Sequence, residues 1–301
     1  MLTINPRDTQ TPELHSYLLS AVAPRPIALA STIDEDGNPN LSPFSFFNVF
    51  SANPPILIFS PARRVRDNTV KHTYENAKAV KEVVINVVTH DMVQQTSLSS
   101  TEYEKGVNEF EKAGFSMKAS ERVKPFRVAE SPVQFECTIR QVIELGKEGG
   151  AGNLIICEVL LMHIDEKVLD ANKKIDQKAL DLVARAGGSY YSRARNGFFE
   201  IPKPLRNKGI GVSSLPESVQ MSPILTGNDL GLLGNVEQLP DKADVDKFMK
   251  DKPEIFGWDR DEKHKFAQQL IQKNDVMGDL NVLLSLTKKI SRKNPMKEKV
   301  K

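Results

Sequence analysis

Residues 24–71 bring together side chains suited to hold a phosphorylated, planar ligand. Arg25 precedes a strand candidate that ends in Ser31 and Thr32, and SPFSFFN (42–48) supplies hydroxyls, aromatic rings and an amide. Cationic and hydroxyl donors bind phosphate through charge-assisted hydrogen bonds, and apolar walls cover a planar ring. Composition alone nevertheless favours a core strand rich in aromatic residues beside a basic surface loop. The basic side chains that follow are Arg63, Arg64, Arg66 and Lys71.

Several other chemistries are excluded by missing motifs. The chain has no GxGxxG after a strand, no GxxxxGK[ST], no GxSxG and no HExxH. It therefore carries none of the sequence signatures of Rossmann, P-loop, α/β-hydrolase or zincin enzymes. Its five histidines are scattered and predict no metal site. Cys137 and Cys157 are too few for a disulfide framework, and their apolar neighbours predict buried free thiols.

Charge and hydropathy limit the partners and the compartment. The 301 residues carry 41 basic and 39 acidic side chains, a net charge of +2, so we expect no nucleic-acid partner. No apolar run approaches the roughly 20 residues that span a bilayer, and the N-terminus lacks the regions of a secretory signal. Together with the low cysteine count, these features predict a cytoplasmic protein that does not associate with membranes.

The elements that would position the candidate side chains are mainly antiparallel strands with inserted helices. Thr11 is suited to cap a first helix, with Pro12 at its first position. Turn signals at 34–39 and 147–153 predict two hairpins. Because no regular helical crossovers separate the strands, a doubly wound parallel sheet is disfavoured and a barrel would remove the sheet edges. The strand candidates are 26–33, 41–50, 56–60, 83–88, 133–145 and 154–164, and the later helix candidates are 69–78 and 176–186.

The composition changes after about residue 200. Residues 201–240 are rich in Pro, Gly and Asn, and the sequence from 241 onward is charged, with leucines at roughly helical spacing. We therefore expect a first domain over 1–204 and a loop-rich linker with a helical extension over 205–301. The basic residues 288–301 are expected to form a solvated tail rather than a nucleic-acid arm, because no aromatic residues are interleaved.

Four longer motifs carry a family resemblance. They are PRPIALAST (24–32), DEDGNPN (34–40), LSPFSFFNVFSANPP (41–55) and NTVKHTYENAKAVKEVVINVV (68–88). In combination they resemble the flavin reductase family with the FMN-binding split-barrel fold, over about residues 10–200. The resemblance implies a mainly β protein with helices, built on a six-stranded antiparallel split barrel. It also implies a homodimer with one FMN per subunit near the dimer interface.

The same resemblance implies roles for individual residues. Those expected at the flavin are Arg25, Ser31, Thr32, Ser45, Phe46, Phe47, Asn48, Lys71 and Thr73. The first three would border the flavin, Ser45–Asn48 would run along the isoalloxazine ring, and Lys71 and Thr73 would reach toward the phosphate. Two positions depart from the family pattern. Leu29 stands where members often carry an aromatic residue, and His72 stands where Asp is usual.

Two segments later in the chain are further candidates. Residues 99–103, SSTEY, resemble a helix start that could cover the flavin site as a lid, although an ordinary helix cap is the simpler interpretation. Tyr190, Tyr191 and Arg193 are candidates to line a nicotinamide site. An aromatic pair that packs one end of the barrel would explain the two tyrosines equally well.

We therefore expect an FMN-dependent oxidoreductase that passes a hydride from NAD(P)H to FMN, and electrons onward to a small-molecule or protein acceptor. FMN carries the redox chemistry, so the sequence singles out no catalytic side chain and no metal. The alternative is a non-enzymatic FMN-binding electron carrier that is reduced by a protein partner. Oxidation of a small phosphorylated amine, which related split barrels carry out, fits the SPFSFFN motif less well. The sequence does not distinguish NADH from NADPH.

Overall fold

The chain divides into two compact units, residues 1–199 and 200–301, and each is considered by itself. The structure, a computed structural model, describes residues 1–201, 208–273 and 275–287. The domain boundary suggested by the sequence, between residues 204 and 205, lies outside the described residues, as does the basic tail. None of the described helices is long and apolar enough to cross a membrane.

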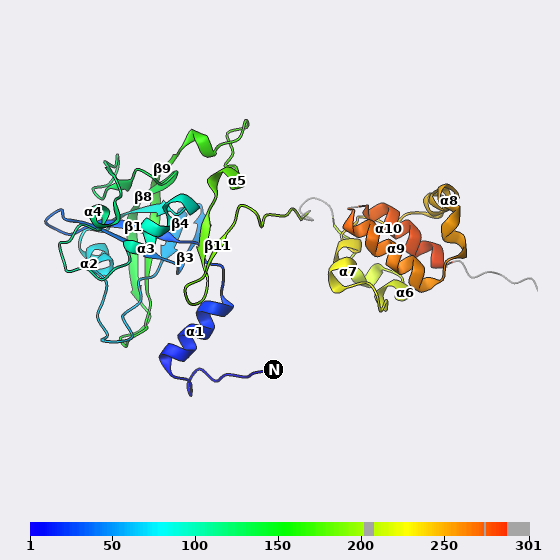
Figure 1. The fold of residues 1–301 in the computed structure, drawn as a ribbon, viewed down its shortest axis with the longest axis horizontal. Coiled ribbons are helices and arrows are strands. Elements are labelled where there is room, and N and C mark those ends of the chain that lie inside the picture. The colour runs from blue at the N-terminus through cyan, green and yellow to red at the C-terminus, as the bar shows by residue number, and fades with distance from the viewer. Residues whose placement is uncertain (202–207, 274, 288–301) are drawn as a thin grey trace, which may run out of the picture. The chain divides into compact units, whose positions relative to one another are not determined.

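A seven-stranded sheet forms the body of the first unit (Figure 1). Its strand order is β2-β1-β5-β8-β9-β4-β3, and every neighbouring pair is antiparallel. The expected antiparallel character is therefore confirmed. The strands are β1 (Ala28–Ile33), β2 (Pro39–Phe44), β3 (Phe47–Ala52), β4 (Pro55–Phe59), β5 (Glu82–Val87), β8 (Val133–Glu144) and β9 (Asn153–Ile164).

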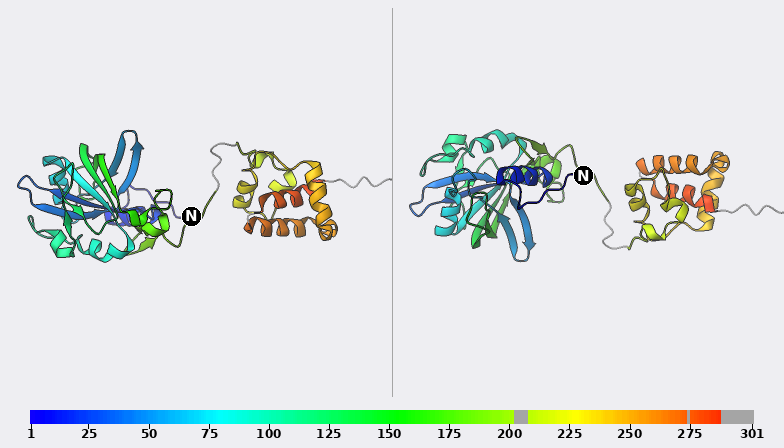
Figure 2. Two further views of the ribbon diagram at one scale, coloured as in Figure 1. Left: turned by 90° about the horizontal axis from the view of Figure 1, so that it is seen from above. Right: turned by 90° about the horizontal axis from the view of Figure 1, so that it is seen from below.

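The seven strands differ from the six that were expected. The apolar run 41–50, predicted as one strand, is divided between β2 and β3 because the chain bends at Ser45 and Phe46. β2 pairs with β1, whereas β3 pairs with β4 at the opposite edge of the sheet (Figure 2). Among the described residues no ladder joins β2 to β3, so the sheet is open at this point rather than a closed barrel.

The turn between β1 and β2 fixes the register of their hairpin. Asp34 Oδ1 accepts hydrogen bonds from the backbone N–H groups of Asp36 (3.1 Å) and Asn38 (2.8 Å). Gly37 adopts a φ of +87°, a backbone conformation that is unfavourable for residues other than glycine. The resulting register puts Thr32 opposite Asn40, at the end of the hairpin next to the turn.

Helices and two pairs of short strands pack around the sheet. α2 contributes Ala77 to the cluster that fills the space between the strands. The helices are α1 (Thr11–Ala21), α2 (His72–Ala79), η1 (His90–Met92), α3 (Val93–Leu98), α4 (Glu109–Ala113), η2 (Glu166–Val168) and α5 (Gln177–Leu180). The short pairs are β6 (Met117–Lys118) with β7 (Arg127–Val128), and β10 (Val183–Arg185) with β11 (Tyr191–Arg193).

β1 is buried on both faces, which agrees with its run of small and apolar side chains. Ala28 and Ala30 belong to a core cluster drawn from six strands and α2. Leu29 belongs to a second cluster that includes side chains of η1 and α4. Successive residues of a strand face opposite sides, so β1 separates the two clusters. Cys137 and Cys157 lie in the first cluster as buried free thiols, as predicted.

Two helices differ from their predicted forms. The helix expected to run to residue 186 is a single turn, α5. Its N-cap is Asp176, as predicted, but Asp181 adopts a φ of +48° and the chain then pairs as β10. The first helix begins one residue earlier than expected, because its N-cap is Gln10 and Thr11 occupies the first helical position.

The second unit is helical and has its own core. Its apolar cluster consists of residues of this unit alone, among them Leu233, Ile255 and Leu283. Three helices begin with reciprocal capping boxes, at Thr226, Asp241 and Asp259. The helices are η3 (Val212–Ser214), α6 (Glu217–Gln220), α7 (Gly227–Leu233), α8 (Lys242–Asp251), η4 (Pro253–Gly257), α9 (Arg260–Gln272), α10 (Val276–Leu284) and η5 (Ser285–Thr287).

Candidate cofactor-binding site

Side chains from β1, β2 and α2 meet in a buried hydrogen-bonded group. Asn40 Nδ2 donates to the hydroxyl oxygens of Thr32 (3.2 Å) and Thr73 (2.9 Å), and Asn76 Nδ2 donates to Thr32 Oγ1 (3.1 Å). All four side chains are buried. These bonds fix the N-terminal turn of α2 against the β1–β2 hairpin. They bring two of the expected site residues, Thr32 and Thr73, together.

Ser31 is separated from this group although it is the neighbour of Thr32. Alternate residues of a strand point to opposite faces, so its side chain lies on the other face of β1. Ser31 is fully buried, and its hydroxyl has no hydrogen-bond partner among the described residues. Leaving a buried hydroxyl without a partner is unfavourable. Ser31 therefore does not share a surface with Thr32 and Thr73.

Three cations of the basic loop converge on the carboxylate of Glu102. Its oxygens lie 2.8 Å from Arg64 Nε, 3.0 Å from Arg66 Nη2 and 3.8 Å from Lys71 Nζ. Hydrogen bonds from Arg64 and Arg66 hold the pKa of Glu102 below its ordinary value. Burial, followed by the positive charge of Arg64, lowers the pKa of Lys71. Asp67 is a second acid beside these cations, 2.8 Å from Arg66, so three cations here face two carboxylates.

A small pocket, here called the cationic pocket, opens beside these groups. Lys71 is the N-cap residue of α2, and no side chain caps that helix. Free backbone N–H groups and the positive end of the helix dipole favour an anion at such a position. These are the kinds of donor that an anionic group requires. The pocket is lined by Asn40, Ser42, Arg64, Lys71, His72, Thr73, Ser99, Ser100, Thr101, Glu102, Tyr103 and Glu109.

Residues 99–103 border this pocket but do not start a helix. α3 ends at Leu98, and the hydroxyls of residues 99–101 donate to the backbone carbonyls of residues 96–98. Such bonds satisfy carbonyls that lack partners at a helix C-terminus. The predicted helix start is therefore wrong. Residues 99–103 nevertheless line the cationic pocket, and Glu102 is one of them.

Arg25 holds backbone segments together. Its guanidinium donates to the carbonyl oxygens of Leu19 (2.5 Å), Val22 (2.6 Å) and Ala186 (3.2 Å), and lies 3.4 Å from Ser45 Oγ. Burial, followed by the charge of another arginine, lowers its pKa. Arg25 therefore ties the end of α1 and the segment after β10 to the turn at Ser45.

The turn between β2 and β3 presents a ring at the surface. Phe46 is 38% exposed and meets the His15 ring of α1 edge to face at 6.3 Å. Phe47 packs against the core cluster of the sheet, and Asn48 is exposed. β2 connects this turn to Ser42 in the cationic pocket, about 10 Å away for three extended residues. The cationic pocket and the exposed ring therefore lie at two places along the same stretch of chain, β2 and the turn that follows it.

A second, larger cleft of about 470 Å³ lies between α3 and the β10–β11 pair. The Arg185 guanidinium stacks over the Tyr191 ring at 4.7 Å. Arg193 donates to the Asp181 carboxylate at 2.9 Å, and this bond lowers the pKa of Asp181. Tyr190 is 78% exposed and does not line the cleft. The lining residues are His90, Val93, Gln94, Ser97, Val183, Arg185, Ser189, Tyr191, Ser192 and Arg193.

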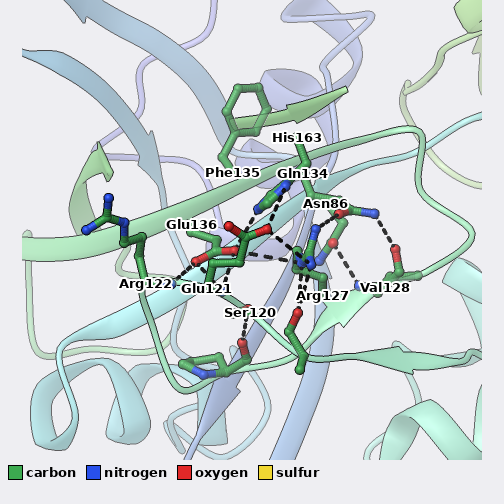
Figure 3. A network of polar contacts seen from close by, with 12 residues as sticks. Asn86, Ser120, Glu121, Arg122, Arg127, Val128, Gln134, Phe135, Glu136 and His163 are labelled. Carbon is green, nitrogen blue, oxygen red and sulfur yellow. Dashed lines mark hydrogen bonds and ion pairs between the residues drawn. The ribbon is translucent and has the colours of Figure 1, made fainter. Parts of the chain in front are cut away.

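A buried ionic network elsewhere in the sheet has a structural role (Figure 3). Glu136 is fully buried and accepts hydrogen bonds from the backbone N–H of Glu121 (3.0 Å) and Arg122 (2.6 Å). His163 Nε2 lies 2.7 Å from the same carboxylate, and Arg127 Nε lies 3.7 Å away. These contacts bind the segment before β7 to β8 and β9. They leave the carboxylate well supplied with partners.

The flavin reductase-like domain model matches residues 20–181. The chain belongs to this family. An uncharacterized protein of Aquifex aeolicus is 36% identical over 188 residues, which are 62% of this chain and 93% of that protein. The uncharacterized protein YwrF of Bacillus subtilis is 30% identical over 62% of this chain and 91% of its own length.

Solved structures agree with the family. Nitrilotriacetate monooxygenase component B from Bacillus cereus has a TM-score of 0.62 and 26% identity, over 67% of this chain and 98% of that one. The 2-nitrobenzoate 2-nitroreductase NbaA of Pseudomonas fluorescens has a TM-score of 0.61 and 21% identity, over 70% of this chain and 100% of that one. This likeness shows a shared fold only. A flavin reductase-like protein with a split-barrel domain from Shewanella frigidimarina has a TM-score of 0.58 and 24% identity, over 67% of this chain and 100% of that one. The first unit thus has the split-barrel fold of flavin reductases.

The match of the flavin reductase-like domain has informative limits. It spans the whole seven-stranded sheet and the residues of the cationic pocket. It ends at Asp181, before β10, β11 and the whole second unit. The wall of the larger cleft that Arg185 and Tyr191 form therefore lies outside the matched region.

Proposed function

We propose that the first unit binds FMN, accepts a hydride from NAD(P)H and passes electrons to a small-molecule or protein acceptor. The observation that carries this proposal is the cationic pocket at the N-terminus of α2, in a chain of the flavin reductase-like family. FMN is a phosphorylated, planar cofactor, and when bound it supplies the redox chemistry. The chain's own residues bind and orient it.

The phosphate is assigned to the cationic pocket. Lys71 and Arg64 supply charge, and the uncapped N-terminus of α2 supplies backbone N–H groups. The Thr73 hydroxyl accepts from Asn40 and keeps its own proton to donate to a phosphate oxygen. Thr32 accepts hydrogen bonds from Asn40 and Asn76 and so helps to hold Asn40 in place. Ser31 contributes only as a buried residue of β1.

The isoalloxazine ring is assigned to the Ser45–Asn48 turn. Ser45 and Phe46 lie between the β1–β2 and β3–β4 ladders, so their N–H groups are available to the polar edge of a ring. Donors at that edge stabilise negative charge on the ring electrostatically. Arg25 is a positioning residue in this proposal, because its guanidinium reaches Ser45 Oγ while it binds three backbone carbonyls.

The larger cleft is assigned to the pyridine nucleotide. Arg185 and His90 offer positive charge or donors, and Tyr191 offers a flat surface. Hydroxyls of three serines also line it, Ser97, Ser189 and Ser192. A ligand with phosphates, sugar hydroxyls and rings matches this mixture.

We further propose a homodimer located in the cytoplasm. Val49 and Phe50 on the edge strand β3 are 64% and 62% exposed, which is the pattern of an apolar surface that a partner covers. The two buried free thiols are compatible with a reducing compartment. Light scattering on the purified chain tests the dimer: a mass of 33.6 kDa, rather than twice that value, would refute it.

The decisive experiment is an absorbance spectrum of the purified protein with added FMN, followed by anaerobic NADH or NADPH. We expect a bound-flavin spectrum that bleaches on addition of one or both nucleotides. A bound flavin that stays oxidised with both would instead indicate the electron carrier. If FMN passes through a desalting column without any retained flavin or change in fluorescence, the proposal fails.

A further inference from the structure

Glu102 lines the cationic pocket and contacts all three cations of the loop. Its carboxylate contacts Arg64 at 2.8 Å, Arg66 at 3.0 Å and Lys71 at 3.8 Å. The three cations come from one loop, whereas Glu102 comes from the separate segment that follows α3. An acid from elsewhere in the chain therefore sits where the charges of the loop converge.

Glu102 is not the only group that holds Arg64 and Arg66 in position. Arg64 Nη1 also donates to Thr69 Oγ1 at 2.9 Å and to the Val70 carbonyl at 2.7 Å. Arg66 also donates to the Asp67 carboxylate at 2.8 Å. Removing the Glu102 carboxylate would therefore leave at least the Arg64 guanidinium anchored, and would free donors that it now occupies.

A carboxylate and a phosphate monoester compete for the same donors. Both present oxygen acceptors with negative charge, and both form charge-assisted hydrogen bonds with arginine and lysine. We propose that Glu102 is an internal competitor for the cofactor phosphate, which weakens FMN binding and so lets the flavin exchange. This inference rests on the proposed function, because it concerns the same pocket.

The competing interpretation is that Glu102 helps to hold the cations in place. In that case its loss would disorder Arg66 and Lys71 and weaken the binding of a phosphate. The two interpretations predict opposite changes in affinity, so one variant separates them. Glu102 is 43% exposed, and a substitution there should not disturb the fold.

The experiment compares FMN with riboflavin, which has the same ring but no phosphate, by fluorescence titration of the full chain. We expect Glu102→Gln and Glu102→Ala to tighten FMN binding about three- to tenfold, a modest change because exposed ion pairs are individually weak. Riboflavin binding should not change. Glu104→Gln is the matched control, because it removes the same charge from an exposed side chain two residues away that has no contact with these cations.

Each remaining outcome has a definite meaning. Unchanged or weaker FMN binding in both Glu102 variants would refute the proposal that Glu102 competes with the phosphate. The proposed function would still stand if the unmodified chain binds FMN. Equal tightening of riboflavin would also overturn the competition, since the effect would not pass through the phosphate. A failure of the unmodified chain to bind FMN would remove the proposed function, and the inference with it.

Discussion

Lys71 is the side chain on which the phosphate assignment depends most directly. Lys71 is the N-cap residue of α2, and its ammonium lies 3.8 Å from a Glu102 oxygen. Among the described residues its charge is thus only weakly committed to another protein group. Such a cation is available for an anionic ligand.

We predict that Lys71→Ala weakens FMN binding by roughly 1–3 kcal/mol, the usual effect of losing a charged hydrogen bond. Riboflavin binding should stay the same, because the ring does not contact this side chain. Fluorescence titration measures both constants. Lys78→Ala is a suitable control, since Lys78 is bound to Glu144 at 3.2 Å at the other end of α2. An FMN constant equal to that of the unmodified chain would refute the role of Lys71.

Residue types indicated a candidate region for the cofactor, but not which of its side chains meet. The sequence placed Ser31 and Thr32 together, whereas strand geometry turns them to opposite faces of β1. Asn40 joins Thr32 to Thr73, yet its motif, DEDGNPN, predicts only a turn. The role of Asn40 follows from the hairpin register, which depends on the Asp34 turn rather than on any spacing along the chain. The contacts of Glu102 are long-range and leave no local signal.

At the scale of elements, strand and hairpin predictions succeeded where turn chemistry was strong. The Asp34–Asn38 turn and the hairpin of β8 and β9 were found from the sequence. The division of 41–50 into β2 and β3 was missed because no Gly, Asn or Asp marks the bend at Ser45 and Phe46. Tertiary pairing with two different edges of the sheet causes this bend. α5 was predicted too long for a similar reason, because β11 draws the chain into a strand pair.

α10 in the second unit contains a titratable group in an apolar setting. Asp279 is fully buried, and neither carboxylate oxygen has a hydrogen-bond partner among the described residues. Burial, followed by the charges of Asp229 and Asp275, raises its pKa from 3.8 to about 8. Between these two pH values the folded state binds more protons than the unfolded state. The contribution of Asp279 to stability therefore declines as pH rises toward 8.

We predict that the second unit loses stability between pH 7 and 8.5, and that Asp279→Asn removes most of this dependence. Burial lowers the pKa of His264 from 6.5, so above pH 7 that group is largely neutral in both states and contributes little. Urea unfolding followed by fluorescence of Trp258, the single tryptophan of the chain, reports on this unit. Equal pH dependence in the variant and the unmodified chain would show that Asp279 does not titrate in this range.

At the scale of the whole molecule, the two units have separate cores. The clusters of the first unit contain no residue beyond Val183, and the cluster of the second unit begins at Ile210. The Aquifex relative matches over 93% of its length with 188 residues, so its length leaves no room for a second unit of this size. Both facts indicate that the first unit contains what its fold requires.

We predict that residues 1–204 alone fold, form a dimer and bind FMN with the affinity of the full chain. The reason is that the cationic pocket, the Ser45–Asn48 turn and the exposed side chains of β3 all lie within this segment. Sedimentation measures the dimer and fluorescence titration measures the affinity. An insoluble product, or FMN binding more than tenfold weaker, would mean that the second unit completes the fold or the site. Equal affinity with altered turnover would assign the second unit to the electron donor or acceptor instead, since neither is needed for FMN to bind.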